Sequence, residues 1–159
     1  MDKPFQRKGG KTNTQIGNEF ENIVLEYFYN EGIYLKKNYA LNIGLEYKKT
    51  HKFDLGNETT MIECKTMKWY ENGKSPGAKL KNWNEAMYYF HLAPNEYKKI
   101  FFVEMDFSQK YCKTLLEYYI ELNYNLIPED VIFYDCYSVD NCKIYTFEDI
   151  KKIMGDKKI

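Results

Sequence analysis

The chain lacks three features that would each point to a class of protein. It carries no net charge, with 23 basic and 23 acidic side chains in 159 residues, so no general attraction to a polyanion is expected. It has no run of roughly 20 apolar residues, the length that spans a bilayer. Its N-terminus is basic but has no apolar signal region. We therefore expect an intracellular protein that is not embedded in a membrane.

Histidine and cysteine are also too few and too scattered to form a zinc site. The chain has two histidines, and its four cysteines include no CxxC pair; they are Cys64, Cys112, Cys136 and Cys142. Zinc sites need such ligands at short, regular spacings. Free thiols are typical of a reducing compartment, so we interpret all four as free and expect a cytoplasmic location.

What the chain does have is a composition typical of one globular domain. Apolar residues make up 44% and charged residues 29%, and the aromatic fraction is high at 18%. No repeat or linker divides the chain, so residues 1–159 are expected to form a single domain with a real core. Residues 1–15 are basic and poor in apolar side chains. They are either a disordered end or a basic arm that reaches a phosphate backbone.

Hydrophobic spacing predicts helices that alternate with strands in the second half of the chain. Thr14 or Asn18 is the expected cap of the first helix, and Ser108 that of the third. The expected helices cover about residues 14–30, 78–92, 108–122 and 147–154, and the expected strands 33–47, 51–56, 60–66, 99–105 and 131–136. This order predicts an α/β fold, with a mixed sheet of about five strands and helices on both faces.

Two neighbouring strands carry the most informative residues. Asp54 lies near the end of one strand, and Glu63-Cys64-Lys65 lies on the next. Side chains alternate along a strand, so Glu63 and Lys65 share a face and Cys64 points to the other. Two carboxylates can hold a hard cation such as Mg²⁺, and an ammonium group can orient water and stabilise charge on a phosphate.

The register of this hairpin decides whether the two acids can meet. If Asp54 lies opposite Glu63, the turn spans roughly Asn57 to Thr60, an ordinary hairpin length. A two-residue Gly56-Asn57 turn would instead leave Glu63 four positions further on, about 13 Å away. Acids so far apart share no metal ion. The metal-site hypothesis therefore predicts the longer loop.

The pattern Phe53-Asp54…Glu63-Cys64-Lys65 resembles that of the PD-(D/E)xK nucleases, the restriction-endonuclease-like superfamily. The expected element order is that of the family's core, so the resemblance covers most of residues 15–137. It implies a restriction-endonuclease-like fold in which Asp54, Glu63 and the main-chain carbonyl of Cys64 hold Mg²⁺, with Mn²⁺ able to substitute. Lys65 would position the attacking water.

The resemblance extends to the first helix, where Gly17 is followed four residues later by Glu21. In the family such an acid faces the site, so Glu21 is a fourth candidate catalytic residue. Each candidate has a simpler interpretation. Asp54 and Glu21 are then solvated acids, Glu63 forms a structural ion pair with Lys65 or Lys52, and Lys65 is an ordinary surface lysine.

The segment after these strands mixes lysines with aromatic residues, as phosphate-tracking and base-stacking surfaces do. Its alternative is a surface loop with an aromatic plug. The candidate nucleic-acid contacts are Lys68, Lys74, Ser75 and Lys79, together with Gln15 at the start of the first helix.

The resemblance implies a Mg²⁺-dependent endonuclease that hydrolyses phosphodiester bonds of double-stranded DNA, most simply by restriction-type cleavage. A domain of this size carries one active site, so cutting both strands predicts a homodimer. Branched-DNA resolution and repair or defence cleavage remain open. So do a nucleic-acid-binding module without catalysis and a small structural protein.

Overall fold

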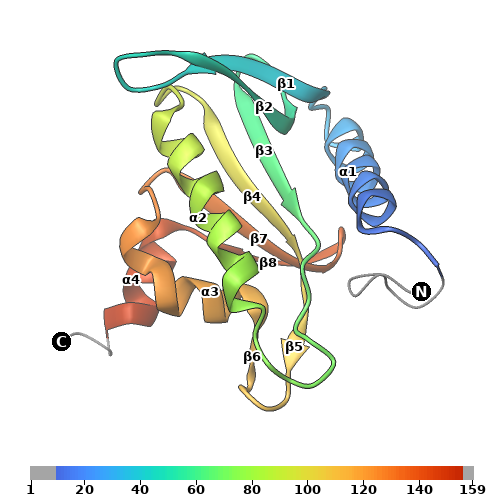
Figure 1. Ribbon diagram of the computed structural model, residues 1–159. Coiled ribbons are helices and arrows are strands. Elements are labelled where there is room, and N and C mark those ends of the chain that lie inside the picture. Colours follow the sequence, from blue (N-terminus) through green and yellow to red (C-terminus); the bar gives the residue numbers. More distant parts are fainter. Residues whose placement is uncertain (1–9, 156–159) are drawn as a thin grey trace.

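The computed structural model describes residues 10–155, and the expected basic arm lies largely outside this range, in residues 1–9. The chain forms an α/β structure built on a six-stranded sheet (Figure 1). Its elements are α1 (Asn13–Asn30), β1 (Lys36–Ile43), β2 (Lys49–Gly56), β3 (Thr60–Lys65), α2 (Gly77–Leu92), β4 (Lys98–Glu104), β5 (Phe107–Ser108), β6 (Lys113–Thr114), α3 (Leu115–Asn123), the 3₁₀ turn η1 (Tyr124–Leu126), β7 (Val131–Ser138), β8 (Asn141–Tyr145) and α4 (Phe147–Gly155).

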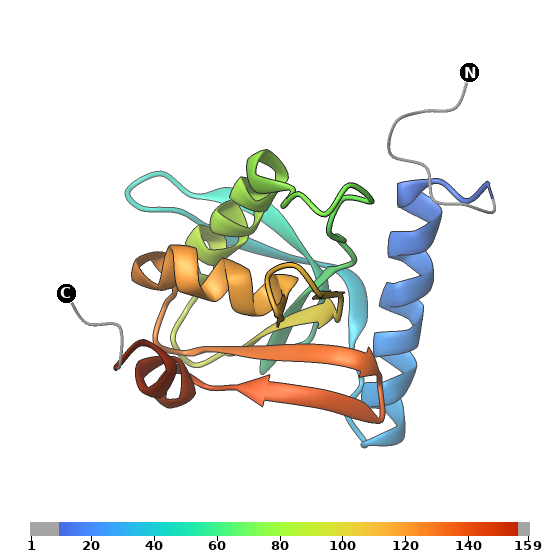
Figure 2. The same ribbon diagram turned by 90° about the horizontal axis from the view of Figure 1, so that it is seen from below.

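The sheet is mixed, with the strand order β1-β2-β3-β4-β7-β8. β3, β4 and β7 run parallel, whereas β1–β2, β2–β3 and β7–β8 pair antiparallel. Figure 2 shows α1 on one side of the sheet and α2 and α3 on the other. The expected α/β class, mixed sheet and helices on both faces are confirmed. The sheet has six strands, however, where about five were predicted.

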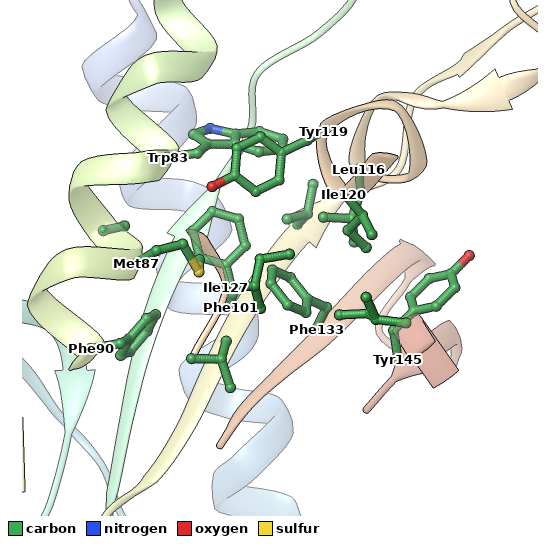
Figure 3. Close-up of a cluster of buried hydrophobic side chains, with 14 of the residues drawn as sticks. Trp83, Met87, Phe90, Phe101, Leu116, Tyr119, Ile120, Ile127, Phe133 and Tyr145 are labelled. Atoms are coloured by element: carbon green, nitrogen blue, oxygen red, sulfur yellow. The ribbon is translucent and has the colours of Figure 1, made fainter. Parts of the chain in front are cut away.

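The larger core lies between the sheet and α2, α3 and α4. Trp83 of α2 contacts Phe101 of β4 and Tyr119 of α3 edge-on, with ring centroids 5.3 and 5.1 Å apart (Figure 3). A smaller core lies under α1, where Val24 and Phe28 pack on β3, β4 and β7. The parallel strands are thus apolar on both faces, which is typical of strands covered by helices on each side.

One acid is buried within the larger core. Asp135 of β7 is fully buried, and its Oδ2 accepts a hydrogen bond of 2.7 Å from Thr114 Oγ1. Thr114 is also the N-cap of α3, because its Oγ1 accepts from the main-chain N–H of Glu117. Burial raises the pKa of Asp135 to about 6, with a further increase from Glu117 and opposing effects of the Thr114 hydrogen bond, Lys143 and Lys68.

The N-cap of α1 lies two residues before the first of the expected caps, Thr14. Thr12 is the N-cap, and it exchanges two hydrogen bonds with Gln15: each side chain accepts from the other residue's main-chain N–H. Neither Thr14 nor Asn18 is the cap, because both lie inside the helix. The predicted end is confirmed, since Gly32 adopts a φ of 81°, which glycine tolerates best, directly after the helix.

The expected third helix is wrong in its first half. Ser108 Oγ accepts from the Tyr111 N–H, which is the contact of a helix cap, but here it closes a turn between β5 and β6. These two short strands form a separate hairpin, and α3 begins only at Leu115.

The interpretation of all four cysteines as free is also wrong. Cys136 and Cys142 are opposite each other in the β7–β8 pair and form a disulfide, whereas Cys64 and Cys112 are free. Only two of the four cysteines therefore remain as free thiols in support of a reducing compartment. Among the described residues, no helix is long and apolar enough to cross a membrane.

Candidate active site

The predicted register of the β2–β3 hairpin is confirmed. Leu55 pairs with Ile62 and Gly56 with Met61, so continuing the ladder sets Asp54 across from Glu63. Asn57 builds the turn. Its Oδ1 accepts from the main-chain N–H groups of Thr59 and Thr60 over 2.9 and 2.8 Å.

The two strands separate at Asp54. The next rung of the ladder would join the Cys64 N–H to the carbonyl of Phe53. Instead, the Cys64 N–H donates to Asp54 Oδ2 over 2.8 Å, and no further β2–β3 pairs follow. Because the N–H and C=O of a strand residue point to the same side, the Cys64 carbonyl also faces this gap. The Cys64 side chain packs against the α1-side core, as predicted.

β2 also breaks its regular pairing with β1 at the same point. Tyr39 pairs with Phe53 and Lys37 with Leu55, but Asn38 and Asp54 between them do not pair. Asn38 has a φ of 54°, a left-handed conformation that asparagine tolerates better than most residues. Phe53 and Leu55 accordingly enter opposite cores, although alternation would place them on one face.

Glu63 is only 8% exposed and has a histidine beside it. His51 Nε2 lies 3.9 Å from Glu63 Oε1. The His51 ring stacks on Tyr89 of α2, with centroids 3.6 Å apart, and meets Phe53 edge-on. Its Nε2 is buried and makes no hydrogen bond within the described part of the chain. A buried carboxylate needs such a polar neighbour or a cation.

The four candidate catalytic residues influence one another electrostatically. Burial raises the pKa of Asp54 above its usual value, and the carboxylates of Glu63 and Glu21 raise it further, against the effects of Cys64 N–H and Lys65. Burial likewise raises the pKa of Glu21; there Lys37 of β1 and Lys65 lower it, and Glu63 raises it. The three carboxylates and Lys65 therefore act on one another across a partly buried region, to which α1, β2 and β3 contribute.

The groups available to hold a cation are few. No cluster of three or more histidine, cysteine, aspartate or glutamate side chains in residues 10–155 is placed to hold a metal ion. The expected ligand set includes only two such side chains, the carboxylates of Asp54 and Glu63. Its third member is a main-chain oxygen, the carbonyl of Cys64. All are oxygen ligands, which Mg²⁺ prefers, and Mg²⁺ commonly keeps several waters.

The predicted nucleic-acid contacts lie on α1, on the β3–α2 loop and on α2. Gln15 uses its side-chain oxygen to cap α1. Lys68 forms an ion pair of 2.9 Å with Glu104. Ser75 and Lys74 lie on the loop before α2, where Ser75 Oγ contacts the Tyr118 hydroxyl at 3.3 Å. Lys74 is exposed, and Lys79 is half-buried on α2.

Two features near the site were not predicted. The sequence shows His51 three residues before Asp54, but its approach to Glu63 follows from the break in β2, which has no local signal. The β5–β6 hairpin was missed because each of its strands has two residues. A scan against protein-family models finds no match, and no curated protein or solved structure matches the chain.

Proposed function

We propose that the protein is a metal-dependent phosphodiesterase that cleaves double-stranded DNA, on a restriction-endonuclease-like core. The observation that carries the proposal is the β2–β3 register, which sets Asp54 across from Glu63 where the strands part. The order α1-β1-β2-β3-α2-β4 supports it, because the family to which the motif points shares that order. Restriction-type cleavage in the cytoplasm by a homodimer is the preferred form. Branched-DNA resolution and repair or defence cleavage use the same site.

The residues around the gap suit a hard cation. Asp54, Glu63 and the Cys64 carbonyl would hold Mg²⁺, with Mn²⁺ as a substitute. The raised pKa of Asp54 fits this role, because its carboxylate is costly to ionise without a compensating positive charge. A bound divalent ion polarises a phosphate and lowers the pKa of water. His51 Nε2 lies on the α2 side of the Glu63 carboxylate, 3.9 Å from its Oε1, and would help to position it.

Lys65 and Glu21 complete the proposed chemistry. The Lys65 ammonium orients a water for in-line attack on phosphorus, and Glu21 steadies that ammonium from α1. The new P–O bond comes from water and the bond to the 3′ oxygen breaks. The products are a 5′-phosphate and a 3′-hydroxyl. The negative charge that develops on the phosphate oxygens lies beside Lys65, which stabilises the transition state.

The test is incubation with supercoiled plasmid, branched DNA and RNA in the presence of Mg²⁺. Lys65→Ala should lower the cleavage rate at least about 100-fold without changing the circular dichroism spectrum. Lys52→Ala is the matched control, because Lys52 is an exposed β2 lysine two residues before Asp54. Equal cleavage by Lys65→Ala and wild type would contradict the proposal.

A further inference from the structure

Three aromatic rings from separate segments stack together beyond the end of the sheet. Trp69 of the β3–α2 loop stacks on Tyr111 of the β5–β6 turn, with centroids 4.9 Å apart and planes 13° apart. Tyr118 of α3 contacts both, at 5.0 and 5.4 Å. We name these three rings the aromatic platform. Figure 1 shows the loop and the hairpin side by side at the lower end of the molecule.

The platform is fixed by hydrogen bonds at its centre. Asp106, between β4 and β5, accepts twice from Trp69: its Oδ2 from the main-chain N–H at 2.8 Å, and its main-chain oxygen from the indole N–H at 3.0 Å. Tyr118 reaches Ser75 on the far side of the loop. The loop and the hairpin therefore form one preorganised unit, and a ligand that binds there pays little ordering entropy.

Two exposed lysines lie on this unit, on different segments. The Lys110 side chain passes Gly73, with its Cδ 3.7 Å from where a Cβ on residue 73 would stand, and Lys74 is the next residue along that loop. Lys110 Nζ also lies 5.4 Å from the Tyr111 ring centroid. Within the described residues neither lysine has an acidic partner, whereas Lys68 and Lys113 pair with acids. Adjacent unpaired cations favour an anionic ligand that spans both.

The unit adjoins the candidate active site along the chain. Val103 of β4 is the ladder partner of Lys65. Phe107 of β5 follows four residues later, about 13 Å at strand rise, or roughly four phosphate steps along one strand of a duplex at about 3.4 Å each. Phe107 is 58% exposed and Tyr70 38% exposed, so the surface also offers apolar rings.

We infer that this surface, made of the aromatic platform with Lys74 and Lys110, holds the DNA backbone beside the scissile phosphate. The inference rests on the proposed function and adds the β5–β6 hairpin as a second substrate-binding element. Lys74 and Lys110 contact neighbouring phosphates, while Tyr70 and Phe107 contact sugar or base edges. Backbone contacts of this kind position the duplex without reading its sequence.

The test measures binding without cleavage, by fluorescence anisotropy of a short labelled DNA duplex in EDTA over a range of salt concentrations. The double variant Lys74→Ala/Lys110→Ala should bind at least about 10-fold more weakly, and its slope of log affinity against log salt should fall by about 2. The control Lys151→Ala/Lys152→Ala removes the same charge from α4 and should stay within about 2-fold of wild type. Both pairs are exposed, so the fold should be retained.

Different results separate this inference from the proposed function. Equal losses in both double variants, or no loss in either, would overturn the inference while leaving plasmid cleavage as the test of catalysis. If the duplex binds through Lys74 and Lys110 but the wild type never cuts DNA, the proposed nuclease activity is refuted, whereas the DNA-binding role of this surface stands. Preferential binding of polyglutamate at the same lysines would indicate an acidic protein partner and would also refute the inference.

Discussion

Asp54 accepts a hydrogen bond of 2.8 Å from the Cys64 main chain, and this bond replaces a rung of the β2–β3 ladder. The contact has two effects. It ends the strand pairing, and it turns one edge of Cys64 toward a gap lined by carboxylates. Asn38 makes the matching break on the β1 side. The candidate site therefore arises from a local failure of sheet pairing around one aspartate.

Removing one carboxylate charge should strongly weaken metal binding without disturbing this geometry. Asp54→Asn keeps an oxygen that can accept from the Cys64 N–H but loses the negative charge, so Mn²⁺ affinity should fall on the order of 100-fold or more. Isothermal titration calorimetry measures the change. Glu63→Gln should behave alike, whereas Glu58→Gln in the exposed turn should bind as wild type does. Unchanged Mn²⁺ binding by Asp54→Asn would exclude Asp54 as a ligand.

His51 allows a closely matched pair of variants. His51→Phe keeps the stack on Tyr89 and removes Nε2, so it should weaken Mn²⁺ binding on the order of 10-fold, as losses of residues behind metal ligands do. His51→Gln keeps an N–H that can reach Glu63 and should recover most of the affinity. Thermal unfolding controls for stability. A loss in His51→Gln as large as that in His51→Phe would show that ring packing matters rather than the contact with Glu63.

Asp135 should make stability depend on pH. Its pKa is about 6 in the folded chain and near 3.8 in an exposed carboxyl group, so the folded state keeps a proton that the unfolded state loses between pH 4 and 6. The free energy of unfolding therefore falls as pH rises through this window, by up to about 3 kcal/mol, and levels off above it.

Asp135→Asn removes this titration and keeps an oxygen for the Thr114 hydroxyl. Relative to wild type, the variant should gain stability as pH rises from 4 to 6 and show no further relative change above pH 6. Urea unfolding at several pH values gives the difference. Parallel pH profiles for the two proteins would show that Asp135 is not the titrating group. Asp149→Asn on α4 is a useful contrast, because hydrogen bonds from Thr146 lower the pKa of the exposed Asp149.

The side chain of the turn residue Asn57 should contribute more to the free energy of unfolding than is usual for a residue in a surface turn. Its Oδ1 accepts from two main-chain N–H groups and from the Thr59 hydroxyl. Asn57→Ala leaves these donors to water and should lower the free energy of unfolding by about 1–3 kcal/mol. Glu58→Ala in the same turn should change it by less than about 0.5 kcal/mol. Equal effects of the two substitutions would mean that the side chain of Asn57 does not hold the turn.

The register of the central hairpin was predictable because it depends on local features. The spacing between Asp54 and Glu63 fixes the turn once the two are required to meet, and Asn57 is a residue that builds such turns. The helices α1, α2 and α4 and the buried strand β4 were predictable for a similar reason. Their apolar residues recur with a clear period or form an uninterrupted run.

The missed features depend on contacts between distant segments. Ser108 has the local pattern of a helix cap, and only the packing of Tyr111 on Trp69 shows that it closes a hairpin turn. The edge strand β8 is short and largely exposed, so it lacks an apolar pattern. Because β7 and β8 pair, Cys136 and Cys142 come together, which their spacing alone does not reveal.

The turn at Asn57–Thr59 sets a limit on how this gene can vary or be engineered. One inserted or deleted codon there would exchange the two faces of β3 and present Ile62 or Cys64 to Asp54 in place of the acid. The exposed tip of the β1–β2 hairpin, with Leu45 and Tyr47, has no such constraint. Epitope tags and length polymorphisms should be tolerated at that tip and rejected at the shorter turn.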